Sequence, residues 1–283
     1  QKTAYEIRNC DWSSDVCSSD LAPRYHKRWA SVNKGPFQST KKLINLVNIE
    51  KENFVLDVAC GTGVVTKQIQ KKIGKSGYVV GIDTSTTAIK IAKKWNEKNI
   101  NLDFINTDAE NFTFSKKFDI ITCQYALFFF PNAQKALKNM KNSLKKSGKI
   151  GISVHGSKDN VPFFSSILDS AVKYIPDYVP PGTPNMDRFG NKTALKSVVK
   201  KAGFSNIVVK EFIFNYNPGK FEDYWKNYIK YIAKPLKEKI NALGYSKRKE
   251  FRNSVRESTL QYTKKNGEII FPWQVLILTA KNN

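Results

Sequence analysis

The feature that most constrains the fold of this chain is a nearly continuous apolar run at residues 54–60 that ends in Gly61-Thr62-Gly63. An uninterrupted run of this kind predicts a strand buried on both faces of a parallel sheet. The two glycines predict a tight turn, because glycine adopts backbone conformations that other residues avoid. A helix is expected to follow at 63–73, so that its first backbone amides face any ligand beyond the strand.

Strand and helix patterns alternate up to about residue 155. We expect further strands at 78–82, 102–105, 118–123 and 149–154, with helices at 85–96 and 133–146. After this region we expect helices at 163–174 and 191–202, and strands at 207–212 and 274–280. The alternation predicts an α/β fold, a doubly wound sheet with helices on both faces.

The chain divides into segments of different character. Back-translated in one frame, DWSSDVCSSDL and QKTAYEI read as the two arms of a common sequencing adapter. We therefore interpret residues 1–21 as non-native and expect the native N-terminus to be missing. Residues 22–283 are expected to form one domain with an N-terminal helical segment at 22–52 and a sheet core at 53–155. Cap insertions are expected at 156–188, which is rich in proline, and at 215–268, which contains an aromatic amphipathic stretch at 221–243.

The composition limits the class of protein. The 47 basic and 24 acidic residues give a net charge of +23, which invites a nucleic-acid or anionic-membrane partner. Lysines dominate and are scattered, so a solvated basic surface is the favoured interpretation. Outside residues 1–21 the cysteines are Cys60 and Cys123, both in apolar runs, which leaves no disulfide framework or zinc pattern. No apolar run is long enough to span a bilayer, so we expect a cytoplasmic protein without stable membrane insertion.

Acidic residues stand at the expected carboxyl ends of three strands. Asp57 lies inside the first strand, where it would repel a pyrophosphate and favour an ammonium group. The third glycine of a dinucleotide fingerprint is absent near Thr66. Asp83 follows the glycine turn by about twenty residues, a spacing typical of a carboxylate that accepts ribose hydroxyls. Its alternative role is a helix N-cap before Thr84 and Ser85, and the two roles are compatible. Asp108 is placed to accept from an exocyclic amine, or is an ordinary turn aspartate.

Four segments, VLDVACGTG, VVGIDTS, NTDAENF and FDIITCQYALFFFPN, resemble in order the motifs of class I S-adenosylmethionine-dependent methyltransferases. The resemblance is greatest to the broad group that includes the ubiquinone and menaquinone biosynthesis methyltransferases. It implies S-adenosylmethionine as the cofactor and a Rossmann-like sheet of seven strands with the last strand antiparallel. The aromatic stretch at 221–243 is expected to be core or packing surface, and a substrate cap is the alternative.

The same resemblance implies roles for individual residues at a donor site. It places Gly61 and Gly63 against the methionine part, Asp57 near its ammonium, Asp83 on the ribose, Asp108 and Ala109 at the adenine, and Gln124 beside the donor. Ala59 and Thr84 belong to the same motifs and are expected to contact the donor too. No metal ligand is implied.

The resemblance leaves the chemistry of the acceptor open. Where quinone enzymes carry an Arg-Asn pair, this chain has Phe128-Phe129, which argues against quinone specificity. Tyr25, next to His26 in the N-terminal segment, and His155, after the fifth expected strand, are candidates for a catalytic base. For each of them a packing or surface role is the favoured interpretation, and a catalytic role is the alternative.

Three functions follow from these patterns. The leading one is methyl transfer to a small, partly apolar or aromatic metabolite, bound near Phe128, Phe129, Phe130, Phe163, Phe164, Tyr174 and Tyr178. The second is an RNA or protein methyltransferase that docks through the basic surface. The third is a donor-binding module without turnover. The sequence does not indicate an oligomeric state.

Overall fold

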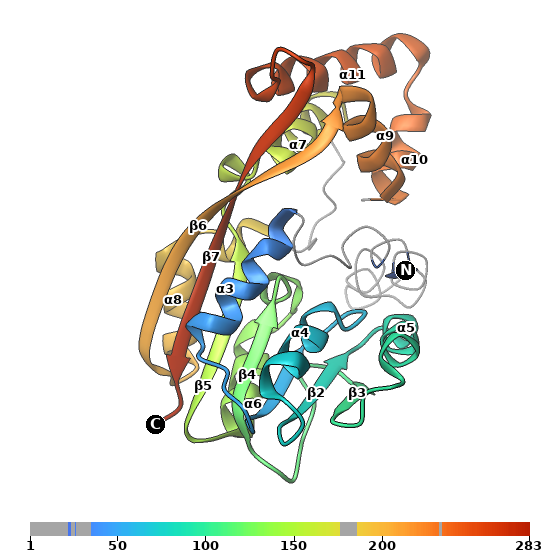
Figure 1. Ribbon diagram of the computed structural model, residues 1–283. Helices are drawn as coiled ribbons and strands as arrows, with labels where there is room; N and C mark the ends of the chain where they lie inside the picture. Colours follow the sequence, from blue (N-terminus) through green and yellow to red (C-terminus); the bar gives the residue numbers. More distant parts are fainter. Residues whose placement is uncertain (1–21, 24–25, 27–34, 176–185, 232–233) are drawn as a thin grey trace, which may run out of the picture.

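The computed structural model of the chain describes residues 22–23, 26, 35–175, 186–231 and 234–283 (Figure 1). The adapter-like residues 1–21 lie outside the described residues, as do the candidates Tyr25 and Tyr178.

Seven strands form one sheet in the order β3-β2-β1-β4-β5-β7-β6. They are β1 (Phe54–Val58), β2 (Tyr78–Asp83), β3 (Leu102–Asn106), β4 (Phe118–Gln124), β5 (Leu144–His155), β6 (Ser205–Lys220) and β7 (Glu268–Lys281). The first five pair in parallel, and β7 runs antiparallel to both β5 and β6. The order reverses between β1 and β4, which is where α/β sheets of this kind bind ligands. The expected Rossmann-like sheet with an antiparallel last strand is confirmed.

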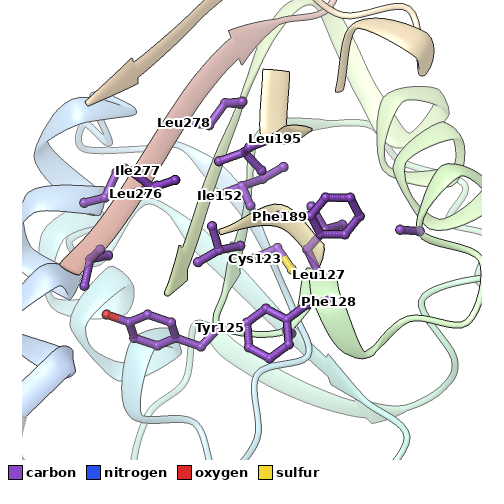
Figure 2. Packing of buried hydrophobic residues seen from close by; sticks show 14 of the residues in the cluster. Cys123, Tyr125, Leu127, Phe128, Ile152, Phe189, Leu195, Leu276, Ile277 and Leu278 are labelled. Atoms are coloured by element: carbon purple, nitrogen blue, oxygen red, sulfur yellow. The ribbon is translucent and has the colours of Figure 1, made fainter. Parts of the chain in front are cut away.

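Helices cover both faces of the sheet. One face carries α3 (Ser39–Leu46), α4 (Val64–Ile73) and α5 (Thr86–Asn96), whose apolar residues form a buried cluster with those of β1, β2 and β3. The other face carries α6 (Ala133–Ser143) and α8 (Lys192–Lys201). Figure 2 shows the second face, where Leu195 of α8 lies with Ile152 of β5 and Leu278 of β7.

The strands β6 and β7 run past the rest of the sheet as a long two-stranded ribbon (Figure 1). Its far end lies among the helices α7 (Pro162–Tyr174), α9 (Phe221–Tyr231), α10 (Lys234–Ala242) and α11 (Tyr245–Thr259). We call these four helices the cap. A buried aromatic cluster joins the cap to the ribbon, with Phe163 in ring contact with Tyr224, Phe271 and Trp273.

The observed elements differ from the expected ones mainly in their ends. The helix expected at 133–146 ends at Ser143, because the chain then enters β5 at Leu144 with a register shift against β4. The expected strands at 207–212 and 274–280 are much longer, because each extends along the other to form the ribbon. The helix α11 has no counterpart among the expected elements. Within the described residues, no helix has both the length and the apolar character needed to cross a membrane.

Candidate active site

The expected site residues gather at one edge of the sheet. Asp57 lies in β1, Asp83 ends β2, Gln124 ends β4 and His155 ends β5, while Asp108 follows β3. Because these strands are parallel, their carboxyl ends meet at the same edge. The site is therefore assembled by sheet register from residues far apart in the sequence.

The glycine turn between β1 and α4 has the backbone geometry that the sequence predicts. Gly61 and Gly63 have φ angles of +55° and +80°, in the left-handed region that favours glycine. A β-carbon at Gly63 would lie 2.6 Å from Cζ of Phe104, whereas one at Gly61 would meet no atom within 4 Å. Ala59 also has a positive φ, of +56°, although it carries a side chain. The turn is thus closely packed beneath Gly63 and open beside Gly61.

Asp83 joins the end of β2 to this turn. Its Oδ2 accepts a hydrogen bond from the backbone amide of Gly61 at 2.8 Å, and its Oδ1 accepts one from the amide of Ser85 at 2.8 Å. The N-cap of α5 is Ser85, whose hydroxyl accepts from the amide of Ala88, so the alternative role of Asp83 as the helix cap is wrong. Burial raises the pKa of the Asp83 carboxyl. Thr84 is exposed beside it.

Asp57 is buried beneath the turn and held by two threonines. Its Oδ2 accepts from the hydroxyl of Thr66 at 2.6 Å, and its Oδ1 accepts from that of Thr122 at 2.8 Å. Burial raises the pKa of its carboxyl, as does the nearby Asp83 to a smaller extent, and together they bring it to about 6 against the opposing effect of these two hydrogen bonds. Sequence reasoning noted Thr66 only as a missing glycine and gave Thr122 no role.

Asp108 shapes the loop that follows β3. Its Oδ1 accepts from the amide of Glu110 at 2.9 Å, and its Oδ2 accepts from the side-chain amide of Asn111 at 2.7 Å. These contacts are those of a turn aspartate, which was its alternative role. Ala109 is buried next to it. A contact of either residue with an adenine ring stays a prediction.

A buried polar layer lies between the end of β4 and the start of α3. The Gln124 amide is hydrogen-bonded to the hydroxyl of Thr40, with its Nε2 donating at 2.9 Å. The hydroxyl of Tyr125 lies 2.7 Å from both the carbonyl oxygen of Pro36 and Oγ of Ser39. Ser39 and Thr40 are fully buried, and sequence reasoning missed both because nothing local marks them as partners of β4.

His26 brings the N-terminal segment against the glycine turn. Its Nδ1 lies 2.8 Å from Oγ1 of Thr62, and its ring packs edge-on against Trp95 of α5. Burial lowers the pKa of its imidazole, and the nearby Lys67 lowers it further. The described part of the N-terminal segment therefore touches the turn at which a donor is expected.

His155 is enclosed by aromatic rings. It stacks on Tyr125 with ring centroids 4.3 Å apart, and Phe128, Phe164 and Trp273 also contact it. The indole of Trp273 donates a hydrogen bond to its Nδ1 at 2.9 Å. Burial lowers the pKa of His155 to about 3, so the ring is neutral at physiological pH. A catalytic role for His155 stays a prediction, and low basicity with Nδ1 already occupied disfavours that of a general base.

The residues at this edge fit S-adenosylmethionine. The start of α4 has no side-chain cap, so its first backbone amides are available to a carboxylate, and Asp57 lies below for an ammonium. The open space beside Gly61 adjoins Asp83, which keeps oxygen lone pairs for ribose hydroxyls. Within the described part of the chain, no group of three His, Cys, Asp or Glu side chains is placed to hold a metal.

Comparison with known proteins gives the same assignment. Residues 55–148 match the family described as a methyltransferase domain. The demethylmenaquinone methyltransferase of Lactobacillus johnsonii is 28% identical over 204 residues, which cover 67% of this chain and 83% of the relative. A solved Bacillus halodurans structure, assigned as a methyltransferase, has a TM-score of 0.59 and 19% identity, and the match covers 87% of this chain and 99% of that one.

A third similar structure was solved with S-adenosyl-L-methionine bound. The structure of Haemonchus contortus phosphoethanolamine N-methyltransferase 2 in complex with S-adenosyl-L-methionine has a TM-score of 0.58 and 14% identity to this chain. The match covers 100% of this chain and 60% of that one. The motifs, the sheet order and these comparisons together place this chain among the class I methyltransferases that use S-adenosylmethionine.

Proposed function

We propose that this enzyme methylates a small, partly apolar or aromatic metabolite. The observation that carries the proposal is the ring of aromatic side chains around His155, directly beyond the carboxyl ends of β4 and β5. Pockets for small ligands are mostly apolar walls with a few polar groups that fix orientation. Here Tyr125, Phe128 and Phe164 supply the walls, and His155 supplies a polar group among them.

The aromatic residues named from the sequence fall into two sets. Phe163 is 1% exposed and packs against Tyr224, Tyr228 and Trp273, so it belongs to the core of the cap. Tyr224 and Tyr228 of the 221–243 stretch are buried in the same core.

Phe129, Phe130 and Phe164 form the second set. They are only partly buried and lie at the carboxyl edge, where they are accessible to a substrate. We assign these three side chains to the acceptor site, beside the buried Tyr125 and Phe128, and we assign Phe163 to the core of the cap.

The chemistry asks little of the protein beyond alignment. S-adenosylmethionine supplies an activated methyl group on a sulfonium, and holding the acceptor atom in line with it accounts for much of the rate. In this proposal Asp57, Asp83 and the glycine turn bind and orient the donor, while the aromatic walls exclude water. No general base has to be assigned if the acceptor is already nucleophilic at neutral pH.

The relatives favour a quinone-like acceptor, with one reservation from the sequence. The Lactobacillus johnsonii relative is named a demethylmenaquinone methyltransferase, which implies an apolar ring with oxygen substituents. Phe128 and Phe129 stand where quinone enzymes carry an Arg-Asn pair, and Phe128 packs with His155 instead. We therefore propose the broader class, an aromatic or quinone-like ring, and leave its substituents open.

The experiment that tests this proposal separates the acceptor classes. The protein is incubated with methyl-labelled S-adenosylmethionine and a cell extract divided into metabolite, RNA and protein fractions. We expect the label in the organic-soluble metabolites. Asp83→Ala serves as the matched control for donor-dependent labelling.

An RNA acceptor predicts a different result. Label chiefly in RNA, together with RNA binding that weakens steeply with salt because phosphate contacts release counterions, would overturn the proposal. It would favour an RNA methyltransferase that docks through its basic surface, as the net charge of +23 suggests. Label chiefly in the protein fraction would overturn the proposal too.

A further inference from the structure

The end of β5 carries two polar side chains, Ser153 and His155, that each keep one polar atom without a hydrogen bond to the described residues. Ser153 and His155 are two residues apart on one strand, so they share a face of the sheet. The Oγ of Ser153 is buried and has no hydrogen-bond partner among the described residues. His155 uses Nδ1 to accept from Trp273, and the described residues offer no hydrogen bond to its Nε2. Buried polar groups are normally paired, so the unpaired hydroxyl of Ser153, on the same face as the Nε2 of His155, points to a ligand.

The contact with Trp273 fixes the form of the imidazole. An indole nitrogen can only donate, so Nδ1 must be the acceptor, and the proton of the neutral ring is then on Nε2. Among the described residues, the rings of Tyr125, Phe128, Phe164 and Trp273 contact His155, and none of these rings carries a charge that would stabilise an imidazolium. His155 therefore presents a hydrogen-bond donor at Nε2 and no base.

Tyr125, on which the imidazole of His155 stacks, is held firmly by its backbone and by its hydroxyl. Tyr125 has a φ of +56°, although it is not a glycine, and its hydroxyl is anchored at Pro36 and Ser39. Ala59, which follows the neighbouring strand β1, has nearly the same φ. Strained residues of this kind cluster at functional sites, where the surrounding structure imposes them. The strain thus occurs at both strand ends that would flank a reacting donor and acceptor.

The position of His155 suits an acceptor and not the donor. β4 lies between β1 and β5 in the sheet, so the end of β5 is about 10 Å from the glycine turn, at roughly 4.8 Å per strand. That separation leaves room for an acceptor ring between Nε2 and the transferred methyl group.

We propose that His155 binds the acceptor by donating a hydrogen bond from Nε2 to an oxygen on its ring, and that Trp273 sets the tautomer. The ligand class is a neutral aromatic ring that carries a hydroxyl or carbonyl oxygen. His155 is then a specificity residue, and Trp273 is a positioning residue that acts through it. The inference rests on the proposed function, because it names the chemistry of that same acceptor.

The tautomer can be read without any substrate. His26 and His155 are the two histidines in the chain, so a nitrogen-15 spectrum of the labelled protein contains only two imidazoles. We expect one ring that does not titrate between pH 5 and 8 and has its proton on Nε2, and we expect His155→Gln to remove its signals. Trp273→Phe, which removes the indole N–H, should let this ring exchange between tautomers. A His155 that is protonated on Nδ1, or that titrates near its ordinary pKa, would overturn the proposal.

Binding tests the specificity. The probes are 1-naphthol and 1-methylnaphthalene, which differ in the oxygen, added to protein saturated with S-adenosylhomocysteine. We expect 1-naphthol to bind at least tenfold more tightly than 1-methylnaphthalene. His155→Leu should abolish this preference, and His155→Gln, which keeps an N–H donor, should retain part of it.

The controls separate this inference from the proposed function. Calorimetry of S-adenosylmethionine binding to His155→Leu should give native affinity, which shows that the variant folds and that the donor site is intact. Equal preference for 1-naphthol in native protein and His155→Leu would overturn the inference, even if the extract experiment yields a methylated metabolite. Label in RNA, in contrast, would contradict the proposed function whatever the tautomer of His155.

Discussion

The carboxylate of Asp83 accepts a hydrogen bond from the backbone amide of Gly61 over 2.8 Å, and this contact ties the end of β2 to the glycine turn after β1. Its other oxygen is bonded to the amide of Ser85 at the start of α5. One side chain thus fixes two loops at the carboxyl edge of the sheet. An oxygen with a remaining lone pair can accept from a ribose hydroxyl without losing either contact.

Asp83→Ala should weaken the binding of S-adenosylmethionine. We expect the native enzyme to bind it with low-micromolar affinity, about 7 to 8 kcal/mol, and the variant to lose about 1 to 3 kcal/mol, as for a hydrogen bond to a charged group. Calorimetry measures both. Asp103→Ala is the matched control, since Asp103 is exposed on β3 and, among the described residues, accepts only from the hydroxyl of Tyr78. Equal affinity for native protein and Asp83→Ala would refute the ribose assignment.

The two glycines of the turn should respond differently to alanine. Both have a positive φ, so each substitution costs about 1 to 2 kcal/mol of strain. In Gly63→Ala the new methyl group also meets the Phe104 ring, which adds about 1 to 3 kcal/mol of overpacking. Gly61→Ala has no such clash, but its methyl group enters the open space beside the turn.

Denaturant unfolding should therefore rank Gly63→Ala as the less stable variant. Donor titration should show that Gly61→Ala loses affinity while it remains folded. If the two variants are equally stable, the contact with Phe104 is not what excludes a side chain at position 63.

The gathering of Asp57, Asp83 and the glycine turn at the carboxyl edge of the sheet could be predicted from the sequence because its signals are local. The apolar run before Gly61, and the acids Asp83 and Asp108 at or just after the ends of the next two strands, can each be read from a few consecutive residues. Partners that the fold brings together left no such signal. Trp273 lies 118 residues after His155, and Thr122 lies 65 residues after Asp57, so only the sheet register joins each pair.

The elements of the cap were predicted less well for a physical reason. The sequence of α11 is strongly charged, and only Phe251, Val255 and Thr259 face the interior, so the apolar pattern is sparse. The lengths of β6 and β7 were underestimated because the two strands pair with each other beyond the edge of the sheet, and this pairing stabilises them. Such pairing depends on residues about sixty positions apart, which a local pattern does not contain.

Packing, and not ion pairs, should hold the cap together. Glu222 of α9 pairs with Arg252 and Arg256 of α11, but its side chain is 62% exposed. Exposed ion pairs contribute about 0 to 1 kcal/mol, so Glu222→Gln should cost less than that. Phe251 is fully buried against Trp225 and Tyr174, and Phe251→Ala should cost about 3 to 5 kcal/mol. Urea unfolding of both variants checks the ranking, and a larger loss for Glu222→Gln would contradict it.

Asp57 should make the stability of the enzyme depend on pH in an identifiable way. Its pKa is raised from 3.8 to about 6 in the folded protein, chiefly by burial beneath the turn. Between these two values the folded state holds a proton that the unfolded state has released. The free energy of unfolding should therefore fall as the pH rises from about 4 to 6, by on the order of 3 kcal/mol, and this contribution should be constant above that range.

Asp57→Asn isolates this contribution, because asparagine has nearly the same shape and does not titrate. We expect the stability of the native protein, relative to the variant, to decrease from pH 4 to pH 6 and then to level off. Other titrating groups cancel in the difference, since both proteins share them. Urea unfolding at half-unit pH intervals measures the effect, and a difference that stays flat or rises over this range would show that Asp57 is not held as a high-pKa carboxyl.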